Sequence, residues 1–294
     1  MSALLDPKTI IAIKNLQLAA KTTVDSFMMG INKSNVKGQG LEFSQYRIYE
    51  PGDDLRWLDW KMFARSDRYY IRESEVDTSV YVRFVIDASN SMKHEDNGFT
   101  KIEYAKYVAA TLGYLAFMQG DAVGVYVCTE NNVSMLPAKK DNQHQKRFYH
   151  QLSSIEVNGS FKENISFKQL VNSGKQKELT IFISDMYQYQ NEISDVLHTL
   201  KAYKNELIVL HLIGENERTM NYAGYDFVED LETGEKLNIG NQKTEEYAER
   251  FQSFLNDVKQ QLLNQQITYC VMNMQQTIEQ SIALFLKTRN KIIR

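Results

Sequence analysis

The 294-residue sequence has few of the residues that cross-link a chain or break its regular structure, with two cysteines and three prolines. Both cysteines, Cys128 and Cys270, lie inside apolar runs (VGVYVCT and ITYCVM), and we interpret them as buried free thiols. No disulfide is therefore expected, and a reducing, cytoplasmic environment is the default expectation. The sequence also has no internal repeat and no low-complexity segment, so a repeat array or a disordered chain is not expected.

Long hydrophobic runs and a strong charge of one sign are missing as well. No stretch approaches the roughly 20 apolar residues of a membrane span, so we expect no such span. The formal net charge of −3 gives no reason to expect a nucleic acid or a membrane surface as a partner. The amino-terminal sequence MSALLDPKTIIAIKNLQLAAK has an early acidic residue and an amphipathic pattern, which does not resemble a secretory signal.

The short motifs of several enzyme classes are absent from the sequence. There is no Gly-x4-Gly-Lys-Ser/Thr phosphate-binding loop and no Gly-x-Ser-x-Gly elbow, and the five histidines show no His-Glu-x-x-His or other metal-ligand spacing. Neither cysteine has a histidine nearby in the sequence. Because no pair of nucleophile and base can be identified, we expect a protein without enzymatic activity.

From residue 80 onward, short apolar runs alternate with amphipathic segments. The runs at residues 80–86, 122–129, 178–184, 206–213 and 267–272 are rich in β-branched residues and mostly apolar, which is typical of strands covered on both faces. A capping box at residues 100–103 (TKIE) begins one of the intervening helices, and Thr277 with Gln280 begins the last. This alternation predicts a doubly wound, mainly parallel α/β sheet over residues 79–294, with residues 133–136 pairing back on the second strand.

Residues 1–78 have a different pattern. A helix is predicted over about residues 7–29, followed by a polar stretch with glycines and by short strand-like pieces around residues 41–49 and 69–76. Far downstream, residues 225–239 (YDFVEDLETGEKLNI) predict a hairpin that interrupts the α/β pattern. We expect this hairpin to join the amino-terminal strands in a small β subdomain.

The segment RFVIDASNSM, residues 83–92, ends an apolar run on Asp87 and places Ser89 and Ser91 at alternate positions after it. A second run, TIFISDMY, ends on Asp185. Ligands of doubly wound sheets bind beyond the carboxyl ends of the strands, where the strand order reverses. If strands 80–86 and 178–184 are neighbours at that reversal, the two carboxylates and the two hydroxyls face one crevice.

Such an all-oxygen set suits a hard divalent cation, with Mg²⁺ expected first and Mn²⁺ or Ca²⁺ as alternatives. Neutral hydroxyl ligands leave the cation short of negative charge. An open position on the metal is therefore expected to attract an acidic residue of a partner protein. This chemistry is that of a binding site and not of a catalytic one.

Residues 87–91, Asp-Ala-Ser-Asn-Ser, resemble the Asp-x-Ser-x-Ser motif of the metal-ion-dependent adhesion site (MIDAS) in von Willebrand factor A-like domains. In a wider match, GQGLEFSQYRIYEPGDDLRWLDWKMFAR (residues 38–65), DASNSM, FISDM and EDLETGE resemble, in this order, the bacterial domain-of-unknown-function 58 (DUF58) family. The resemblance implies a von Willebrand A-like fold, no established enzymatic activity, and association with AAA+ ATPases of the MoxR type, often as a presumed adaptor.

Carried over to this sequence, the resemblance also implies a set of metal ligands. Asp87, Ser89 and Ser91 take the first motif, and Asp185 takes the last carboxylate. The middle position is usually a threonine, and Ser160 in the segment VNGS is our candidate for it.

The same residues admit three alternative interpretations. In one, the side chains only cap the following helix and satisfy loop amides. In another, the domain is a metal-free scaffold of the same fold. In the third, Asp87 is the phosphoryl-accepting nucleophile of a haloacid dehalogenase-like phosphatase. Those enzymes typically carry a second aspartate two residues later, where this sequence has Ser89.

Residues 38–65 carry the most specific part of the resemblance. Within them, EPGD (residues 50–53) predicts a turn followed by a short helix. This helix can serve to clamp the β subdomain to the α/β domain. Alternatively, Arg56, Trp57, Trp60 and Arg65 form part of a partner-binding face, because tryptophan and arginine are favoured at interfaces.

Overall fold

The fold is described from a computed structural model, which defines residues 7–34, 45–48, 70–73, 80–130, 132–161, 178–202, 205–220, 227–238 and 244–290. The chain divides into two compact units. The larger unit combines Met1–Met28 with Val80–Arg294, and the smaller unit is Met29–Ser79. Within the smaller unit, β1 (Gln45–Ile48) and β2 (Tyr70–Glu73) form an antiparallel pair, inside the two regions where strands are predicted.

The larger unit is built on a six-stranded sheet with the strand order β12-β9-β8-β3-β6-β7. Its strands are β3 (Tyr81–Asp87), β6 (Ala122–Cys128), β7 (Val133–Lys139), β8 (Glu178–Ser184), β9 (Glu206–Ile213) and β12 (Thr268–Asn273). All neighbours pair in parallel except β7, which returns antiparallel to β6. The prediction of a doubly wound, mainly parallel sheet is therefore confirmed, and β3 and β8 are direct neighbours as predicted.

The interior strands are mostly apolar because both faces of the sheet are covered. Along β3, Phe84 and Ile86 contribute to one hydrophobic core, whereas Val85 between them contributes to a second core on the opposite face. The same alternation occurs on β8, where Ile181 and Ile183 face the first core and Phe182 the second. Successive side chains of a strand point to opposite faces, so a strand buried on both sides is formed by a nearly continuous apolar run.

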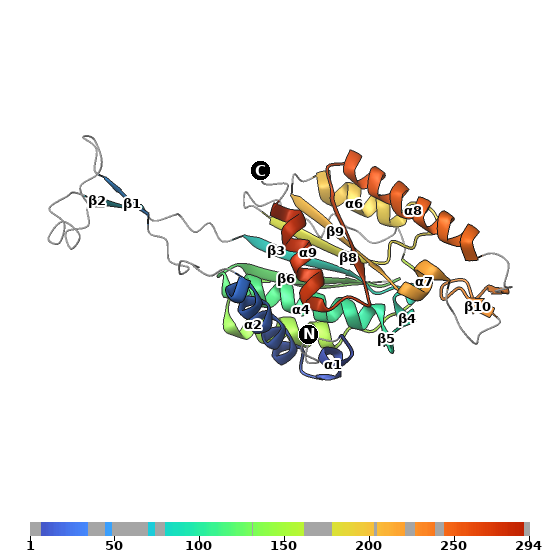
Figure 1. Cartoon of the computed structure of the whole chain (residues 1–294), viewed down its shortest axis with the longest axis horizontal. Coiled ribbons are helices and arrows are strands. Elements are labelled where there is room, and N and C mark those ends of the chain that lie inside the picture. Colours follow the sequence, from blue (N-terminus) through green and yellow to red (C-terminus); the bar gives the residue numbers. More distant parts are fainter. Residues whose placement is uncertain are drawn as a thin grey trace. The chain divides into compact units, whose positions relative to one another are not determined.

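Helices cover the two faces unequally. The first core is covered by α1 (Pro7–Ala12), α2 (Leu16–Ser34), α4 (Lys101–Met118), α5 (Asn142–Ser153) and α9 (Ile278–Asn290). The second core is covered by α6 (Glu192–Ala202) and α8 (Thr244–Asn264). Figure 1 shows α6 and α8 on the opposite side of the sheet from α2 and α4.

Helix α4 begins with the predicted capping box. The Thr100 hydroxyl accepts a hydrogen bond from the Glu103 amide, while the Glu103 carboxylate accepts one from the Thr100 amide. These reciprocal bonds satisfy two of the amides that a helix start leaves unpaired. They fix the first turn of α4, so that Lys101, at its first position, is held at the carboxyl end of the sheet.

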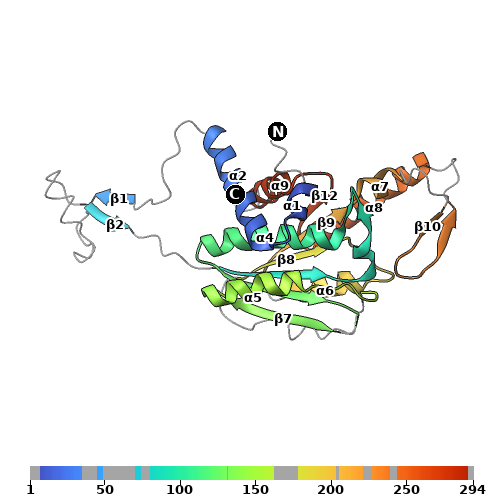
Figure 2. The ribbon, with the colours of Figure 1, turned by 90° about the horizontal axis from the view of Figure 1, so that it is seen from below.

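Short elements follow the carboxyl ends of the parallel strands. They are the 3-10 helix η3 (Asn90–Lys93), the small hairpin of β4 (Glu95–Asp96) and β5 (Phe99–Thr100), the helix α7 (Glu215–Thr219), and the hairpin of β10 (Phe227–Glu229) and β11 (Lys236–Asn238). Figure 1 shows β4, β5, α7 and β10 at one end of the sheet, and Figure 2 shows α7 and β10 there from below. These elements surround the edge where a ligand of a doubly wound sheet is expected.

Two details differ from the predicted domain organisation. The predicted amino-terminal helix is interrupted at residues 13–15, and residues 1–28 belong to the α/β unit instead of the β subdomain. The reason is that Ile10 and Leu16 are buried in the first core, and the Tyr107 hydroxyl of α4 hydrogen-bonds the carbonyls of Ile11 and Ile13 (2.9 and 2.6 Å).

The predicted hairpin forms as β10 and β11, and its predicted union with the amino-terminal strands stays a prediction. In the described part of the chain, β10 and β11 form a two-stranded sheet of their own, and the structure groups this hairpin with the α/β unit. The anchor is a hydrogen bond from the Tyr187 hydroxyl, in the loop after β8, to the Asp230 carboxylate between the two strands.

The packing of α1 and α2 on α4 predicts that Tyr107→Phe lowers the free energy of unfolding by a measurable amount. This change removes the hydroxyl that pairs with two loop carbonyls. Buried groups left without partners cost about 1–3 kcal/mol, so the midpoint of urea unfolding should fall correspondingly. Tyr114→Phe, on the same helix at the rim of a cavity, is the control and should change the stability by less than about 0.5 kcal/mol. Equal midpoints for both variants would contradict the docking.

Candidate metal centre

Strand β3 delivers Asp87 to the centre of the sheet's carboxyl edge. The side chain is fully buried, because β6 and β8 flank the strand on both sides. Its Oδ1 accepts a hydrogen bond from the Ser89 amide (2.9 Å), and its Oδ2 accepts one from the Ser184 hydroxyl (2.7 Å). Ala88 continues the pairing with β6 by donating its amide to the Cys128 carbonyl (2.8 Å), so the loop leaves the sheet in a fixed direction.

The two serine hydroxyls of the motif lie next to each other and next to Asp185. The Oγ atoms of Ser89 and Ser91 are 2.9 Å apart, and the Ser91 hydroxyl donates to Oδ1 of Asp185 (3.2 Å). Asp185 follows directly after β8, and all four side chains are buried. The structure therefore brings Asp87, Ser89, Ser91 and Asp185 together as the sequence predicts, while their role as metal ligands stays a prediction.

The segment of Ser160 runs beside the Asp87–Ser91 loop. The Asn158 amide donates to the Ala88 carbonyl (2.9 Å), and the Asn90 amide donates to the Gly159 carbonyl (2.6 Å). Gly159 has a φ of +66°, a conformation that glycine adopts at little cost, and this turn brings the chain up to the loop. Ser160 is thus adjacent to the cluster, and its use as the middle ligand stays a prediction.

A buried lysine, which no sequence motif indicates, lies at the same site. Lys101, at the start of α4, is 3% exposed, and its Nζ contacts Oδ2 of Asp185 (2.9 Å) and Oε1 of Glu217 in α7 (2.6 Å). Burial alone would lower the pKa of Lys101, but the two carboxylates outweigh it and raise the pKa to about 12. Burial likewise opposes the charge of Asp185, but Lys101 holds the pKa of Asp185 below its usual value.

Asp87 receives no such compensation. Burial, together with the charge of Asp185, raises the pKa of Asp87 to about 6, although hydrogen bonds from Ser89 and Ser184 act in the other direction. The neighbouring His211 does not supply a positive charge at neutral pH, because burial lowers its pKa to about 4. The carboxylate of Asp87 is therefore a buried negative charge that the surrounding protein stabilises poorly.

A third carboxylate reaches the site from the β10–β11 hairpin. The pKa of Glu232 is raised to about 7 by its burial and by the charges of Asp87 and Asp185, against a hydrogen bond with Ser91. Its Oε1 is buried, and within the described residues it has no hydrogen-bond partner. Glu232 belongs to the EDLETGE segment, which carries part of the family resemblance but was not predicted to lie at the site.

The interpretation of the serines as helix caps is supported in part. Loop amides do use the two aspartates, because Asp87 accepts from the Ser89 amide and Asp185 from the Tyr187 amide (3.2 Å). Ser89 occupies the position before η3, but its side chain makes no capping hydrogen bond to that helix. Capping therefore accounts for the aspartates and not for the pair of hydroxyls.

The donor set fits a hard divalent cation. Carboxylate and hydroxyl oxygens are the ligands that Mg²⁺ prefers, usually with several waters retained. Among the described residues, no three or more His, Cys, Asp or Glu side chains form a metal site by themselves, so a cation here depends on the serine hydroxyls and on water. The carboxyl groups of Asp87, Asp185, Glu217 and Glu232 lie near the ammonium of Lys101, and the raised pKa values of Asp87 and Glu232 reflect the poor compensation of their negative charge.

Family comparison agrees with the resemblance seen in the sequence. The family model described as "Protein of unknown function DUF58" matches residues 45–261. The chain belongs to the DUF58 family. Uncharacterised proteins of similar sequence include Rv1480 of Mycobacterium tuberculosis and Mb1516 of Mycobacterium bovis, each 24% identical over 234 residues, which is 78% of this chain and 73% of the relative.

Solved structures similar to this DUF58 protein include several with low sequence identity. BatB of Bacteroides thetaiotaomicron is 18% identical with a TM-score of 0.43, over 71% of this chain and 100% of BatB. An aerotolerance-related membrane protein of Bacteroides fragilis is 16% identical with a TM-score of 0.45, over 72% and 100%. The VWA domain of SpRpn10 is 14% identical with a TM-score of 0.40, over 69% and 94%. The strand order and the Asp-x-Ser-x-Ser loop after β3 give the von Willebrand A-like architecture in this chain's own structure.

Two further features of the DUF58 protein concern its predicted partner-binding face and the character of its helices. Most of residues 38–65, including Arg56, Trp57, Trp60 and Arg65, lie outside the described residues, so their predicted partner-binding role stays a prediction. None of the helices in the described part of the chain combines the length and hydrophobicity that a bilayer crossing requires.

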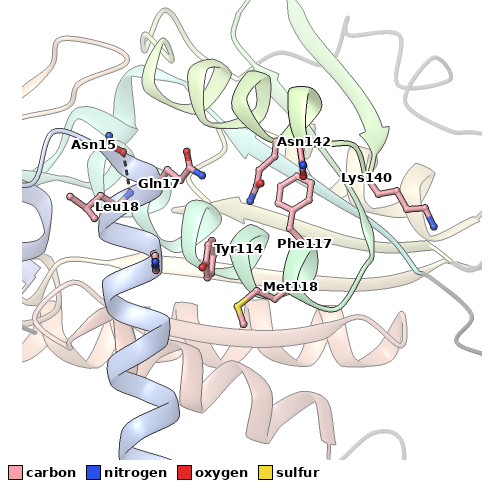
Figure 3. Close-up of a pocket in the computed structure, with 10 residues that line it drawn as sticks. Asn15, Gln17, Leu18, Tyr114, Phe117, Met118, Lys140 and Asn142 are labelled. Atoms are coloured by element: carbon pink, nitrogen blue, oxygen red, sulfur yellow. Dashed lines mark hydrogen bonds between the residues drawn. The ribbon is translucent and has the colours of Figure 1, made fainter. Parts of the chain in front are cut away.

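A cavity in the α/β unit lies away from the carboxylate cluster. It has a volume of about 510 Å³ and is lined by residues of α2, the carboxyl-terminal end of α4, and α5 (Figure 3). Tyr114, Phe117 and Met118 of α4 line it, whereas Lys101 at the other end of the same helix contacts the cluster. At about 1.5 Å per residue, the two sites lie roughly 20–25 Å apart along the helix.

The ion pair between Lys101 and Asp185 predicts that Lys101→Met strongly lowers the free energy of unfolding. The variant leaves a buried carboxylate without its ammonium, which costs about 3–5 kcal/mol, measured by guanidinium unfolding in chelator. Asp185→Asn should cost less in the Lys101→Met background than in the wild type, because the pair is then already broken. Lys93→Met, at an exposed lysine of η3, is the control and should change the stability by less than about 0.5 kcal/mol. Strict additivity of the two changes would contradict a coupled pair.

Proposed function

We propose that this DUF58 protein is a non-enzymatic interaction adaptor that holds a divalent cation, first of all Mg²⁺, at Asp87, Ser89 and Ser91, with Asp185 opposite and Ser160 as the middle ligand. The observation that carries this proposal is the buried cluster of carboxylates and adjacent hydroxyls at the carboxyl edge of the sheet. A bound cation offsets the poorly compensated negative charge, and its remaining coordination position takes an acidic residue of a partner protein.

The surroundings of the cluster support a docking role. The loop after β8 and the neighbouring hairpin expose large apolar side chains, among them Tyr189 (80% exposed) and Phe227 (57% exposed). Tyr187 and Leu231, in the same loop and hairpin, are also exposed. Aromatic side chains are enriched at protein interfaces because they bury much area at a small entropic cost.

The proposed partner is an AAA+ ATPase of the MoxR type. The support for it is the membership in the DUF58 family, together with the association that the family resemblance implies. The contact would use the metal crevice or the face of residues 56–65. A cytoplasmic location is proposed with this partner, and the two buried free thiols support it.

Binding without turnover is proposed because the cluster lacks the arrangement of a phosphatase. Asp87 is buried and engaged by Ser89 and Ser184. The position two residues after it, where a haloacid dehalogenase-like enzyme needs an aspartate as its general acid, is Ser89. Hydroxyls of this kind serve a cation better than a proton transfer.

One observation favours a metal-free scaffold as the second candidate function. The ammonium of Lys101 already neutralises Asp185, so one of the proposed charges at the site is compensated without a metal. Under this alternative, the serines only stabilise the loop, and a divalent cation has no effect on the folded protein.

A thermal melt separates the two candidates. A cation that binds the folded chain and not the unfolded one adds about 2.7 kcal/mol at 100 times its dissociation constant. For a domain somewhat above 200 residues, this corresponds to a rise in Tm of roughly 5–10 °C in millimolar Mg²⁺ relative to chelator. Asp87→Ala and Ser89→Ala should abolish the rise.

Ser160→Ala tests the middle ligand in the same assay, and a reduced rise would support its coordination of the metal. Ser153→Ala, at an exposed hydroxyl at the end of α5, is the matched control and should keep the full rise. A wild type that melts at the same temperature with metal and with chelator would favour the metal-free scaffold.

Partner binding is predicted to depend on the same cation. The wild-type protein should co-purify a MoxR-type AAA+ ATPase from its native cell at low salt in the presence of Mg²⁺. Chelator or Asp87→Asn should lose that ATPase, because the open metal position is then missing. Recovery of equal amounts with Asp87→Asn would place the contact elsewhere, and recovery of no ATPase under any condition would count against the partner itself.

A further inference from the structure

The turn between β10 and β11 is held rigidly beside the cluster. Oδ1 of Asp230 accepts hydrogen bonds from the amides of Glu232 and Thr233 (both 2.8 Å), and the Gly234 amide donates to the Asp230 carbonyl (2.8 Å). The other carboxylate oxygen of Asp230 accepts from the Tyr187 hydroxyl, two residues beyond Asp185. The turn is thus tied directly to the loop that carries Asp185.

Glu232 is oriented differently from its neighbours in this turn. Leu231, Thr233 and Glu235 are exposed, as is usual for residues of a surface turn, whereas Glu232 is partly buried. Its Oε1 is shielded from solvent, and the described residues offer it no hydrogen-bond donor. A buried acceptor without a partner costs about 1–3 kcal/mol, and more when it carries a charge.

The direction of this side chain makes the cost larger. The carboxylate of Glu232 lies close enough to Asp87 and Asp185 to interact with their charges, and its Oε1 is buried there without a donor among the described residues, so it adds a carboxylate where two are already buried. Lys101 does not relieve it, because the contacts of that ammonium are with Asp185 and Glu217. The side chain of Glu232 lies at a surface turn, where an outward orientation would give it water. A bound cation explains why it instead lies inward, near other carboxylates.

We propose that Glu232 is a ligand of the cation, supplied by the chain itself. It takes the coordination position that an acidic residue of a partner protein would otherwise use. This inference rests on the proposed function, since it requires a cation at Asp87, Ser89 and Ser91. The β10–β11 hairpin then competes with partner proteins for the metal. A partner carboxylate binds the metal only after Glu232 has left it, so partners must also bind or displace the β10–β11 hairpin.

The test combines metal affinity with hydrogen exchange on the full-length protein, using Mg²⁺ alone as the probe. Glu232→Gln keeps the size of the side chain and removes its charge. It should weaken Mg²⁺ binding by about 10-fold or more in a calorimetric titration, because cation affinity depends on the number of charged ligands. Mg²⁺ should slow amide exchange in residues 227–238 of the wild type and leave it unchanged in Glu232→Gln.

Glu235→Gln is the matched control, because Glu235 lies in the same turn with its side chain exposed. This variant removes the same charge at nearly the same place and should match the wild type in both measurements. If Glu235→Gln also lost Mg²⁺ affinity tenfold, the loss in Glu232→Gln would reflect only the net charge of the turn, and the proposal would be overturned.

Water relaxation with Mn²⁺ tests the coordination position itself. If Glu232 occupies a place on the metal, Glu232→Gln frees it for water, and the water relaxation by bound Mn²⁺ should rise. Excess acetate should then lower the relaxation of Glu232→Gln, by replacing that water with a carboxylate, and leave the wild type unchanged. Equal relaxation of the two proteins with and without acetate would overturn the proposal.

The outcomes separate this inference from the proposed function. If the wild type binds Mg²⁺, Asp87→Asn does not, and Glu232→Gln equals the wild type in affinity, exchange and relaxation, the internal ligand is wrong and the metal site stands. If the wild type binds no divalent cation, both the proposed metal site and the role of Glu232 as its ligand are wrong.

Discussion

The structure depends on the parallel pairing of β3 with β6 on one side and β8 on the other. This pairing makes β3 an interior strand whose end is closed off from water on both sides, so Asp87 becomes a buried carboxylate at the centre of the sheet's edge. It also sets Ser184 and Asp185 of the β8 end beside Asp87. The strand order thereby assembles the site, and the loops only complete it.

Burial of charge is handled differently at two places along β3 and β8. Near their beginnings, Arg83 and Glu178 form a closed buried ion pair at 2.8 Å, with the guanidinium also over the ring of Tyr126. At their carboxyl ends, Lys101 compensates Asp185, but Asp87 and Glu232 remain as additional carboxylates. A buried ion pair with good geometry needs no further partner to compensate its charges. Carboxylates that converge from separate elements without such compensation instead indicate a site that is completed by a ligand.

The sheet and the core of the cluster could be predicted from the sequence, because both follow from local patterns. Apolar runs that end on Asp87 and Asp185 predict neighbouring strand ends, and the parallel register of β3 and β8 confirms that prediction. Lys101, Glu217 and Glu232 could not be predicted, since each comes from a different element and their convergence is a tertiary property. The hairpin itself could be predicted from its turn, but its bond to Tyr187 could not, because a two-stranded pattern does not specify what it packs against.

The hydrogen bonds of the cluster restrict how a cation can be held. Oδ1 of Asp185 accepts from Ser91 and from the Tyr187 amide, and its Oδ2 accepts from Lys101, so both oxygens are already engaged. Asp185 thereby orients the Ser91 hydroxyl, and its Oδ2 keeps capacity for one further partner. Glu232, in contrast, has a buried oxygen without a partner among the described residues. Each oxygen of Asp87 and Asp185 thus already has a donor, whereas Oε1 of Glu232, from the distant hairpin, is a buried oxygen that the described protein groups leave unused.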